Sequence, residues 1–194
     1  MIELRQLIDR FNREMDRAVK AGAYEPTAGA MATVGPGGRP GVRMVLLKEA
    51  DERGFVVYTN LESRKGRELA VNAWAALCFW WGPAATQVRV EGRVEVVTPA
   101  EADAYFASRP RAKQIGAWAS NQSEPLASRQ VLLDRVAAIE AEYRDRTIPR
   151  PPYWTGFRVV PDRMEFWYGH EDRLHERLDY RLERGVWVEK ILSP

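Results

Sequence analysis

Apolar residues recur at every third or fourth position over the first twenty residues of the chain. This spacing predicts an amphipathic N-terminal helix within residues 1–22. Later segments alternate apolar and polar residues or are rich in β-branched and aromatic residues, most regularly between Gln87 and Val96, where Gly92 indicates a bend or bulge. Strands are therefore predicted over residues 29–34, 43–48, 55–59, 75–81, 87–96, 154–160, 164–168, 175–182 and 186–191.

Helical segments interrupt these strands. A short helix is predicted over residues 62–72, with Ser63 or Asn60 as its N-cap. The sequence Thr98-Pro99-Ala100-Glu101 has the form of a capping box and begins a helix that ends near Ala107. This helix opens a predicted helical insertion over residues 98–146, which also contains helices over residues 113–119 and 126–143.

The order of these elements indicates the fold class. Strands with inserted helices and few strand–helix–strand alternations favour a mainly β protein, an antiparallel barrel with peripheral helices, over a doubly wound sheet. A length of 194 residues is enough for one hydrophobic core and short for two. We therefore expect residues 1–194 to form a single domain.

Charge and cysteine content narrow the possible functions. The 29 basic residues are interleaved with 27 acidic ones, and no run of like charge resembles a nucleic-acid-binding tail. Cys78 is the only cysteine, no apolar run approaches the ~20 residues of a membrane span, and the first residues lack a signal-like apolar core. We expect a cytoplasmic protein that binds neither nucleic acid nor membrane. No metal is expected, although carboxylates could in principle complete a site with His170 and His175.

Two clusters of cations point to a phosphate. The strand from Arg43 to Lys48 begins and ends with a permanent cation, and Ser63-Arg64-Lys65 lies at the predicted start of a helix. A helix start offers free N–H groups and the positive end of the dipole, so an anion there would relieve the conflict with two basic residues. By themselves, Arg43 and Lys48 are more often solvated strand ends than ligands. Together the clusters favour a phosphate-bearing cofactor.

A set of short motifs gives the chain a resemblance to a known family. From about residue 24 to the C-terminus it resembles the pyridoxine (pyridoxamine) 5'-phosphate oxidases, which are homodimeric FMN enzymes with a split-barrel fold. The resemblance depends on Arg43-Met44-Val45-Leu46-Leu47-Lys48, Tyr58-Thr59-Asn60, Ser63-Arg64-Lys65, Tyr105-Phe106-Ala107-Ser108-Arg109-Pro110-Arg111, Gln114-Ile115-Gly116-Ala117-Trp118, Gln122-Ser123, Glu165-Phe166-Trp167 and Arg173-Leu174-His175-Glu176-Arg177.

The resemblance implies roles for particular residues. It implies that FMN is held by Arg43, Met44, Val45, Leu46, Leu47, Lys48, Tyr58, Thr59, Arg64, Lys65, Gln87, Gln122, Ser123, Trp167 and Arg177, partly from the other subunit. It implies that the substrate is bound by Lys48, Tyr105, Arg109, Lys113, Arg173 and His175. Arg173 and His175 would lie beside the reacting carbon and act as the catalytic residues. Trp118 and Trp154 are expected to be core or interface aromatics.

The reaction implied is oxidation of pyridoxamine or pyridoxine 5'-phosphate to pyridoxal 5'-phosphate, with hydride passing to FMN and O₂ reduced to H₂O₂. Lys113 stands where the family commonly has a serine, Tyr168 replaces a common glutamine, and the sequence starts at its first helix without a preceding lid segment. We therefore expect a site that is more open or is closed by another element. Two alternatives stay open: a related flavin oxidase acting on another ring, such as a phenazine precursor, and a non-catalytic module that binds FMN or pyridoxal phosphate.

Overall fold

Antiparallel strands close into a barrel in the computed structural model, which describes residues 2–194. The strands pair in the order β3-β2-β1-β4-β5-β6, and pairing of β3 with β6 completes the closure. The antiparallel barrel predicted from the sequence is thereby confirmed. The barrel strands are β1 (Ala28–Val34), β2 (Pro40–Asp51), β3 (Gly54–Asn60), β4 (Trp74–Trp81), β5 (Thr86–Val96) and β6 (Trp154–Tyr168).

Strand β6 is longer than predicted and changes partner along its length. Its first half pairs with β3 over residues 154–159, and its second half pairs with β7 over residues 163–168. The prediction of two separate strands here was wrong, because a bulge beside Pro161 lets the chain continue. The bulge lies opposite Gly92, where an added Cβ would approach the Val160 carbonyl oxygen to 2.0 Å.

A terminal hairpin extends the sheet beyond the barrel. It consists of β7 (Glu176–Glu183) and β8 (Val186–Ile191), and β7 pairs with the outer half of β6. Strand β2 also exceeds its predicted length: it runs from Pro40 to Asp51, so only Glu52 and Arg53 separate it from β3.

Helix α1 (Leu4–Lys20) packs across the barrel, as the N-terminal periodicity predicted. Its Phe11 is fully buried and makes edge contacts with Phe55 and Phe79, so the helix completes the main core. No helix in residues 2–194 combines the length and apolar character needed to span a bilayer. The remaining helices are α2 (Arg64–Val71), the short 3₁₀ turn η1 (Gly82–Ala84), α3 (Pro99–Ser108), α4 (Arg111–Ala119) and α5 (Arg129–Glu142).

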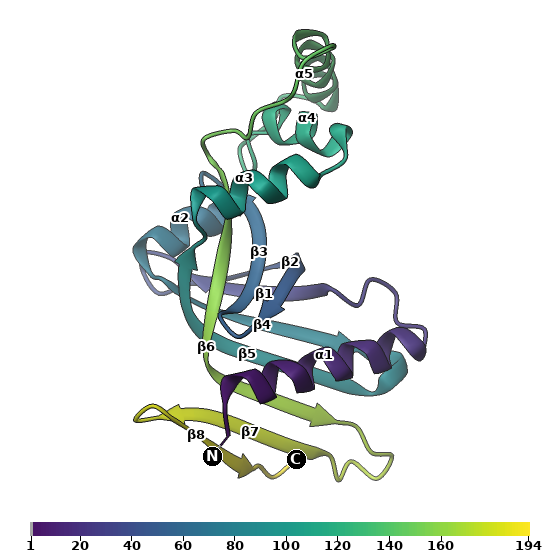
Figure 1. Ribbon diagram of the computed structural model, residues 1–194, viewed down its shortest axis with the longest axis vertical. Helices are drawn as coiled ribbons and strands as arrows, with labels where there is room; N and C mark the ends of the chain where they lie inside the picture. The colour runs from purple at the N-terminus through teal and green to yellow at the C-terminus, as the bar shows by residue number, and fades with distance from the viewer. Residues whose placement is uncertain (1) are drawn as a thin grey trace.

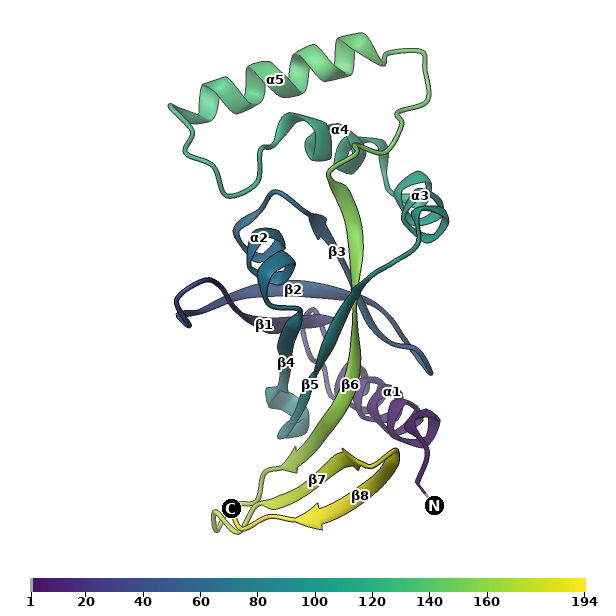
Figure 2. The same ribbon diagram turned by 90° about the vertical axis from the view of Figure 1, so that its left-hand side faces the viewer.

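The helical insertion and the terminal hairpin lie at opposite ends of the molecule. Figures 1 and 2 show α3, α4 and α5 at one end, the β7–β8 hairpin at the other, and the barrel between them. The capping box of α3 forms as predicted, whereas α5 begins at Arg129 with Ser128 as its cap, later than expected. None of the α5 residues is fully buried.

Candidate functional site

A cavity of about 560 Å³ lies between the barrel and the helical insertion. Strands β2 and β3 form one side and α3 and α4 the other, so motifs far apart in the sequence meet here. Four lining side chains are cationic, and within residues 2–194 no Asp or Glu lines this cavity. Its lining comprises Met44, Val45, Leu46, Lys48, Tyr58, Thr59, Lys65, Tyr105, Ser108, Arg109, Pro110, Lys113, Gln122 and Trp154. A concave site of this size and charge is suited to a phosphorylated small molecule.

Lys65 supplies a buried positive charge to the cavity. Ser63 caps α2 by accepting a hydrogen bond from the Gly66 N–H, which fixes the first turn of the helix. The Lys65 Nζ donates to Gln122 Oε1 at 2.8 Å, Thr59 Oγ1 at 2.9 Å and Ser63 Oγ at 3.1 Å. Burial, with the nearby Arg43 charge, lowers the pKa of Lys65 to about 8, although Glu68 partly opposes this effect. All three acceptors are neutral, so an anion would stabilise the ammonium.

Three aromatic rings form another wall. Tyr58 from β3 stacks on Tyr105 from α3, and both rings lie nearly parallel to Trp154 at the start of β6. The Arg109 guanidinium lies 4.8 Å from the centroid of the Trp154 ring. Its Nη1 atom is buried without a hydrogen-bond partner in the described structure, and burial lowers the pKa of Arg109. This donor is available to a ligand oxygen.

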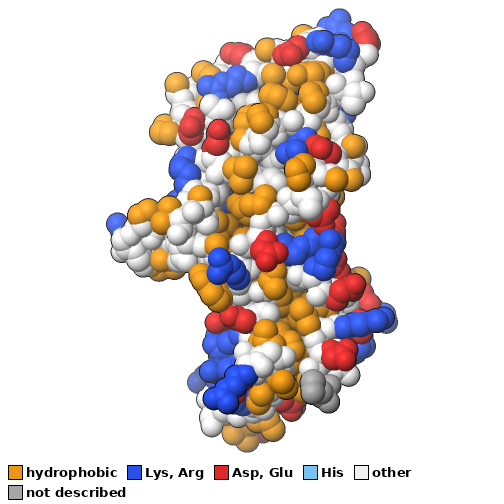
Figure 3. Space-filling model, turned by 60° about the vertical axis from the view of Figure 1, so that its left-hand side comes forward, with side chains coloured by type: hydrophobic (Ala, Val, Ile, Leu, Met, Phe, Trp, Pro, Cys, Tyr) orange, Lys and Arg blue, Asp and Glu red, His pale blue; other side chains and the backbone are white. Residues whose placement is uncertain are grey.

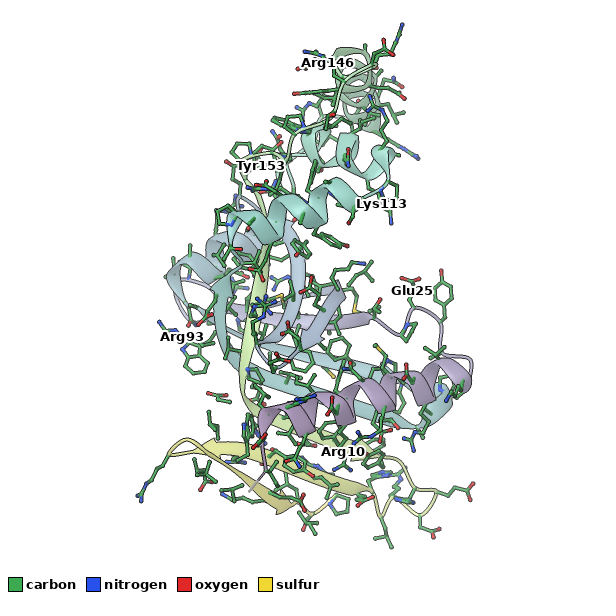
Figure 4. All side chains as sticks on the ribbon, in the orientation of Figure 1. Arg10, Glu25, Arg93, Lys113, Arg146 and Tyr153 are labelled. Carbon is green, nitrogen blue, oxygen red and sulfur yellow. The ribbon has the colours of Figure 1, made fainter. Side chains whose placement is uncertain are left out.

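Trp154 was expected to be a core or interface aromatic, and it is 6% exposed in a small hydrophobic cluster with Phe106, Ile115 and Ile148. Its ring also lines the cavity and contacts the predicted ligands Tyr58 and Arg109. Its pairing opposite Asn60 in the β3–β6 ladder places it beside the Tyr58-Thr59-Asn60 motif. The place of Trp154 in the cavity wall follows from this long-range strand pairing, which no local sequence pattern indicates. Lys113 extends from α4 on the side of the insertion nearest the barrel (Figure 4) and also lines the cavity.

Arg43 and Arg64 do not line this cavity, although both were predicted to bind FMN. They contact the same carboxylate: Arg43 Nη2 lies 2.9 Å from Glu68 Oε2, and Arg64 Nε lies 2.8 Å from Glu68 Oε1. Leu47 also lies elsewhere, because its side chain points into the barrel core, whereas Met44 and Leu46 face the cavity. Ser123 lines a smaller cavity beside α5.

The other predicted residues form a second group on the far part of the sheet. Gln87, Trp167 and Arg177 are neighbours across β5, β6 and β7. His175 lies with its ring centroid 4.5 Å from that of Trp167, and its Nδ1 accepts a hydrogen bond from the His170 N–H. Arg173 precedes it in the β6–β7 loop with a left-handed φ of 59°. In one chain this second group does not line the 560 Å³ cavity.

Two family matches together cover most of the chain. Residues 15–143 match the family described as pyridoxamine 5'-phosphate oxidase. The chain belongs to this family. Residues 154–194 match the pyridoxine 5'-phosphate oxidase C-terminal dimerisation region, which contains β6, β7 and β8. The second group of predicted residues on β6, β7 and their loop therefore lies in the family's dimerisation region.

Individual relatives agree with the family assignment. A pyridoxine/pyridoxamine 5'-phosphate oxidase of Myxococcus xanthus is 58% identical over 96% of this chain and 91% of its own length. The crystal structure of PhzG from Burkholderia lata, in complex with tetrahydrophenazine-1-carboxylic acid, is 33% identical with a TM-score of 0.92, covering 96% of this chain and 92% of that one. A pyridoxamine 5'-phosphate oxidase-related, FMN-binding protein of Nostoc punctiforme shares the fold, with a TM-score of 0.73, 16% identity, and coverage of 100% and 99%.

Proposed function

We propose that this member of the pyridoxamine 5'-phosphate oxidase family oxidises pyridoxamine 5'-phosphate or pyridoxine 5'-phosphate to pyridoxal 5'-phosphate, with FMN as its cofactor. The main support for this proposal is the cavity. Four cations and, within the described chain, no carboxylate line it, and stacked aromatic rings form one of its walls. When bound, the flavin supplies the redox chemistry, taking up a hydride and reducing O₂ to H₂O₂. The protein's part is to bind, orient and shield the reactants.

The donors near α2 fit the phosphate of FMN. Lys65 is 8% exposed and has only neutral hydrogen-bond acceptors, so an incoming phosphate would gain a charge-assisted bond without displacing a carboxylate. Arg43 and Arg64 add cationic donors near the same helix start. Thr59 and Gln122, which already contact Lys65, would complete the polar surroundings of the phosphate.

The donors near α3 and α4 fit the phosphate of the substrate. Lys48, Arg109 and Lys113 line the cavity together, and Arg109 has a buried terminal nitrogen without a partner in the described chain. Tyr105 lies on the preceding turn of α3, with its ring stacked on Tyr58. Two cationic regions in one cavity would seat two phosphates, with the ring of the substrate held between them.

A homodimer would complete the site. Outward-facing side chains of β2 and β4 form an exposed apolar surface that includes Val42 at 72%, Met44 at 66% and Trp80 at 56% exposure. A surface of this kind favours association, and Figure 3 shows a face where hydrophobic side chains lie exposed among charged ones. In our proposal the partner's β5–β7 region brings Gln87, Trp167, Arg173, His175 and Arg177 to this cavity. His175 would then orient a ring hydroxyl or move a proton, and Arg173 would orient the substrate.

Anaerobic mixing tests the proposal. The flavin-loaded protein is mixed with pyridoxamine 5'-phosphate without oxygen, and absorbance near the flavin band is followed before air is admitted. We expect bleaching as the amine is oxidised and water hydrolyses the resulting imine to pyridoxal 5'-phosphate and ammonia, and then recovery in air with stoichiometric peroxide. A protein that binds FMN but never bleaches with either phosphorylated substrate would instead be a binding module.

A phenazine-type substrate is the second candidate, because the Burkholderia lata PhzG structure contains tetrahydrophenazine-1-carboxylic acid. The same anaerobic assay with that compound distinguishes the two. Faster bleaching with the tricyclic acid than with pyridoxamine 5'-phosphate would favour the second candidate. The cations Lys48, Arg109 and Lys113 favour the phosphorylated substrate, since a monocarboxylate would neutralise less of their charge.

A further inference from the structure

Glu68 occupies an unusual place beside the cation-lined cavity. It is an acidic residue on α2, 6% exposed, one turn after Arg64 and Lys65. It lies outside the cavity lining, yet it contacts two of the arginines expected to bind FMN. No predicted role accounts for a carboxylate at this position.

Its two oxygens have separate partners. Oε1 accepts from Arg64 Nε at 2.8 Å, while Oε2 accepts from Arg43 Nη2 at 2.9 Å and from Thr33 Oγ1 at 2.5 Å. Arg43 is held further by Nη1, which donates to the Met31 carbonyl oxygen at 3.1 Å and to Thr33 Oγ1. Arg43 is therefore held through both terminal nitrogens, and Arg64 through Nε. Arg64 keeps both terminal nitrogens for another acceptor, and its side chain is 61% exposed.

Gly41 packs directly against the side chains of Arg43, Arg64 and Glu68. A Cβ added there would lie 2.9 Å from Arg43 Nη2, 3.0 Å from Arg64 Nη2 and 3.1 Å from Glu68 Oε1. The two guanidinium groups and the carboxylate thus meet against a position where a side chain would crowd them. The Arg43–Glu68 ion pair thus joins strand β2 to helix α2 at this point.

Glu68 is ionised at neutral pH. Burial would raise its pKa, but hydrogen bonds from Thr33, Arg64 and Arg43 outweigh burial and lower the pKa. The triad of Arg43, Glu68 and Arg64 then carries one net positive charge, and Lys65 adds another.

We propose that Glu68 is a positioning residue for the phosphate of the flavin: it holds Arg43 and Arg64 side by side next to Lys65, with their remaining N–H groups available to the phosphate. This inference depends on the proposed function, since it assumes a phosphorylated flavin. A supporting partner of this kind orients ligating groups, much as second-layer residues orient metal ligands.

Removing the charge of Glu68 distinguishes two effects on phosphate affinity, because the electrostatic effect and the loss of positioning have opposite signs. By Coulomb's law alone, removing a negative charge near a phosphate site strengthens phosphate binding. If Glu68 positions the arginines, removing it weakens phosphate binding, because Arg64 loses its hydrogen-bond partner and gains rotamer freedom, and Arg43 keeps only its Nη1 contacts.

The experiment compares FMN with riboflavin, which lacks the phosphate, as ligands of the full-length apoprotein. Dissociation constants are measured by quenching of flavin fluorescence for wild type, Glu68→Gln, Glu68→Asp and Asp51→Asn. The ratio of the riboflavin constant to the FMN constant reports the phosphate contribution and does not depend on the folded fraction. Asp51 is the matched control, because its carboxylate also bridges two arginines, Arg53 and Arg158, outside the cavity.

We expect Glu68→Gln to lower this ratio roughly tenfold and Asp51→Asn to leave it within twofold. Glu68→Asp keeps the charge but is one methylene shorter, so it should also lower the ratio. An unchanged or increased ratio in both Glu68 variants would overturn the inference. A wild-type protein with no preference for FMN over riboflavin would instead contradict the proposed function itself.

Discussion

Tyr58 and Tyr105 stack face to face in the wall of the cavity, with ring centroids 3.9 Å apart and ring planes 13° from parallel. One ring comes from the barrel and the other from the helical insertion. In our proposal Tyr58 contacts the cofactor and Tyr105 the substrate phosphate, so this stack joins the two binding regions. Burial raises the pKa of Tyr58 to about 12, and both phenols stay neutral in the working pH range.

A double-mutant cycle measures this stack. Tyr58→Leu, Tyr105→Leu and the double variant are compared with wild type by urea unfolding. Because stacked aromatic pairs contribute beyond simple burial, we expect a coupling free energy of about 0.5–1.5 kcal/mol. Additive losses in the double variant would show that the rings do not stabilise each other.

Trp154 should affect substrate affinity through Arg109. Trp154→Leu removes the ring beneath the guanidinium, and a cation–π contact of about 1 kcal/mol corresponds to a roughly fivefold rise in KM for the phosphorylated substrate. Trp154→Phe retains a ring and should show a smaller rise, and kcat should change little in either. Trp118→Leu is the control, because Trp118 packs on Tyr143 and Tyr153 away from the cavity lining. Equal effects of Phe and Leu at position 154 would contradict this contact.

Lys65 should make FMN binding depend on pH. Its pKa is lowered to about 8 in the free protein, so above that pH the ammonium deprotonates. Binding a phosphate dianion favours the protonated form, and FMN affinity should therefore fall as pH rises through 8, with uptake of a proton. Calorimetry in two buffers of different ionisation enthalpy measures that uptake, and Lys65→Arg should abolish it. In the apoprotein, the unfolded chain keeps the Lys65 proton up to pH 10.5, whereas the folded protein loses it near pH 8. The free energy of unfolding should therefore rise between these two pH values.

Glu101 should contribute to stability only above acidic pH. Its carboxylate accepts from the Thr98 N–H and side chain and from Arg53 and Arg158, and these contacts lower its pKa from 4.5 to about 2. A lowered folded-state pKa gives stability that is present above 4.5 and is lost as pH falls toward 2. We expect Glu101→Gln to cost about 1 kcal/mol in the free energy of unfolding at pH 7. Urea unfolding across this pH range should show the two proteins converging near pH 2, and a constant difference would contradict the assignment.

Local patterns in the sequence predicted most helices and strands but not which strands pair with one another. The period-two run from Gln87 and the Thr98 capping box each depend on neighbouring residues, and both formed as expected. Residues 154–160 and 164–168 were predicted as separate strands, but the bulge beside Pro161 lets β6 continue. The single-domain organisation stays a prediction.

The site was harder to predict, because its geometry depends on contacts between distant residues. Lys48, Lys65, Arg109 and Lys113 line one cavity, and their binding roles stay predictions. The contact between Arg43 and Glu68 joins residues on different elements, and no local pattern indicates it. The role of Trp154 likewise depends on the β3–β6 pairing. The predicted roles of Arg173 and His175 stay predictions until the dimer is tested.

The length of strand β6 sets the separation between two predicted site regions, one at each end of the strand. Trp154 stands at its first residue and Trp167 near its last, a span of about 40 Å at ~3.3 Å per residue. In a homodimer, one end would serve its own subunit's reaction centre and the other end its neighbour's. Losing or gaining one residue between them, without a second bulge to absorb it, would turn every later side chain, including that of Trp167, to the opposite face of the sheet. We therefore expect an insertion or deletion within this strand to be more damaging than one in the exposed turn at residues 36–39.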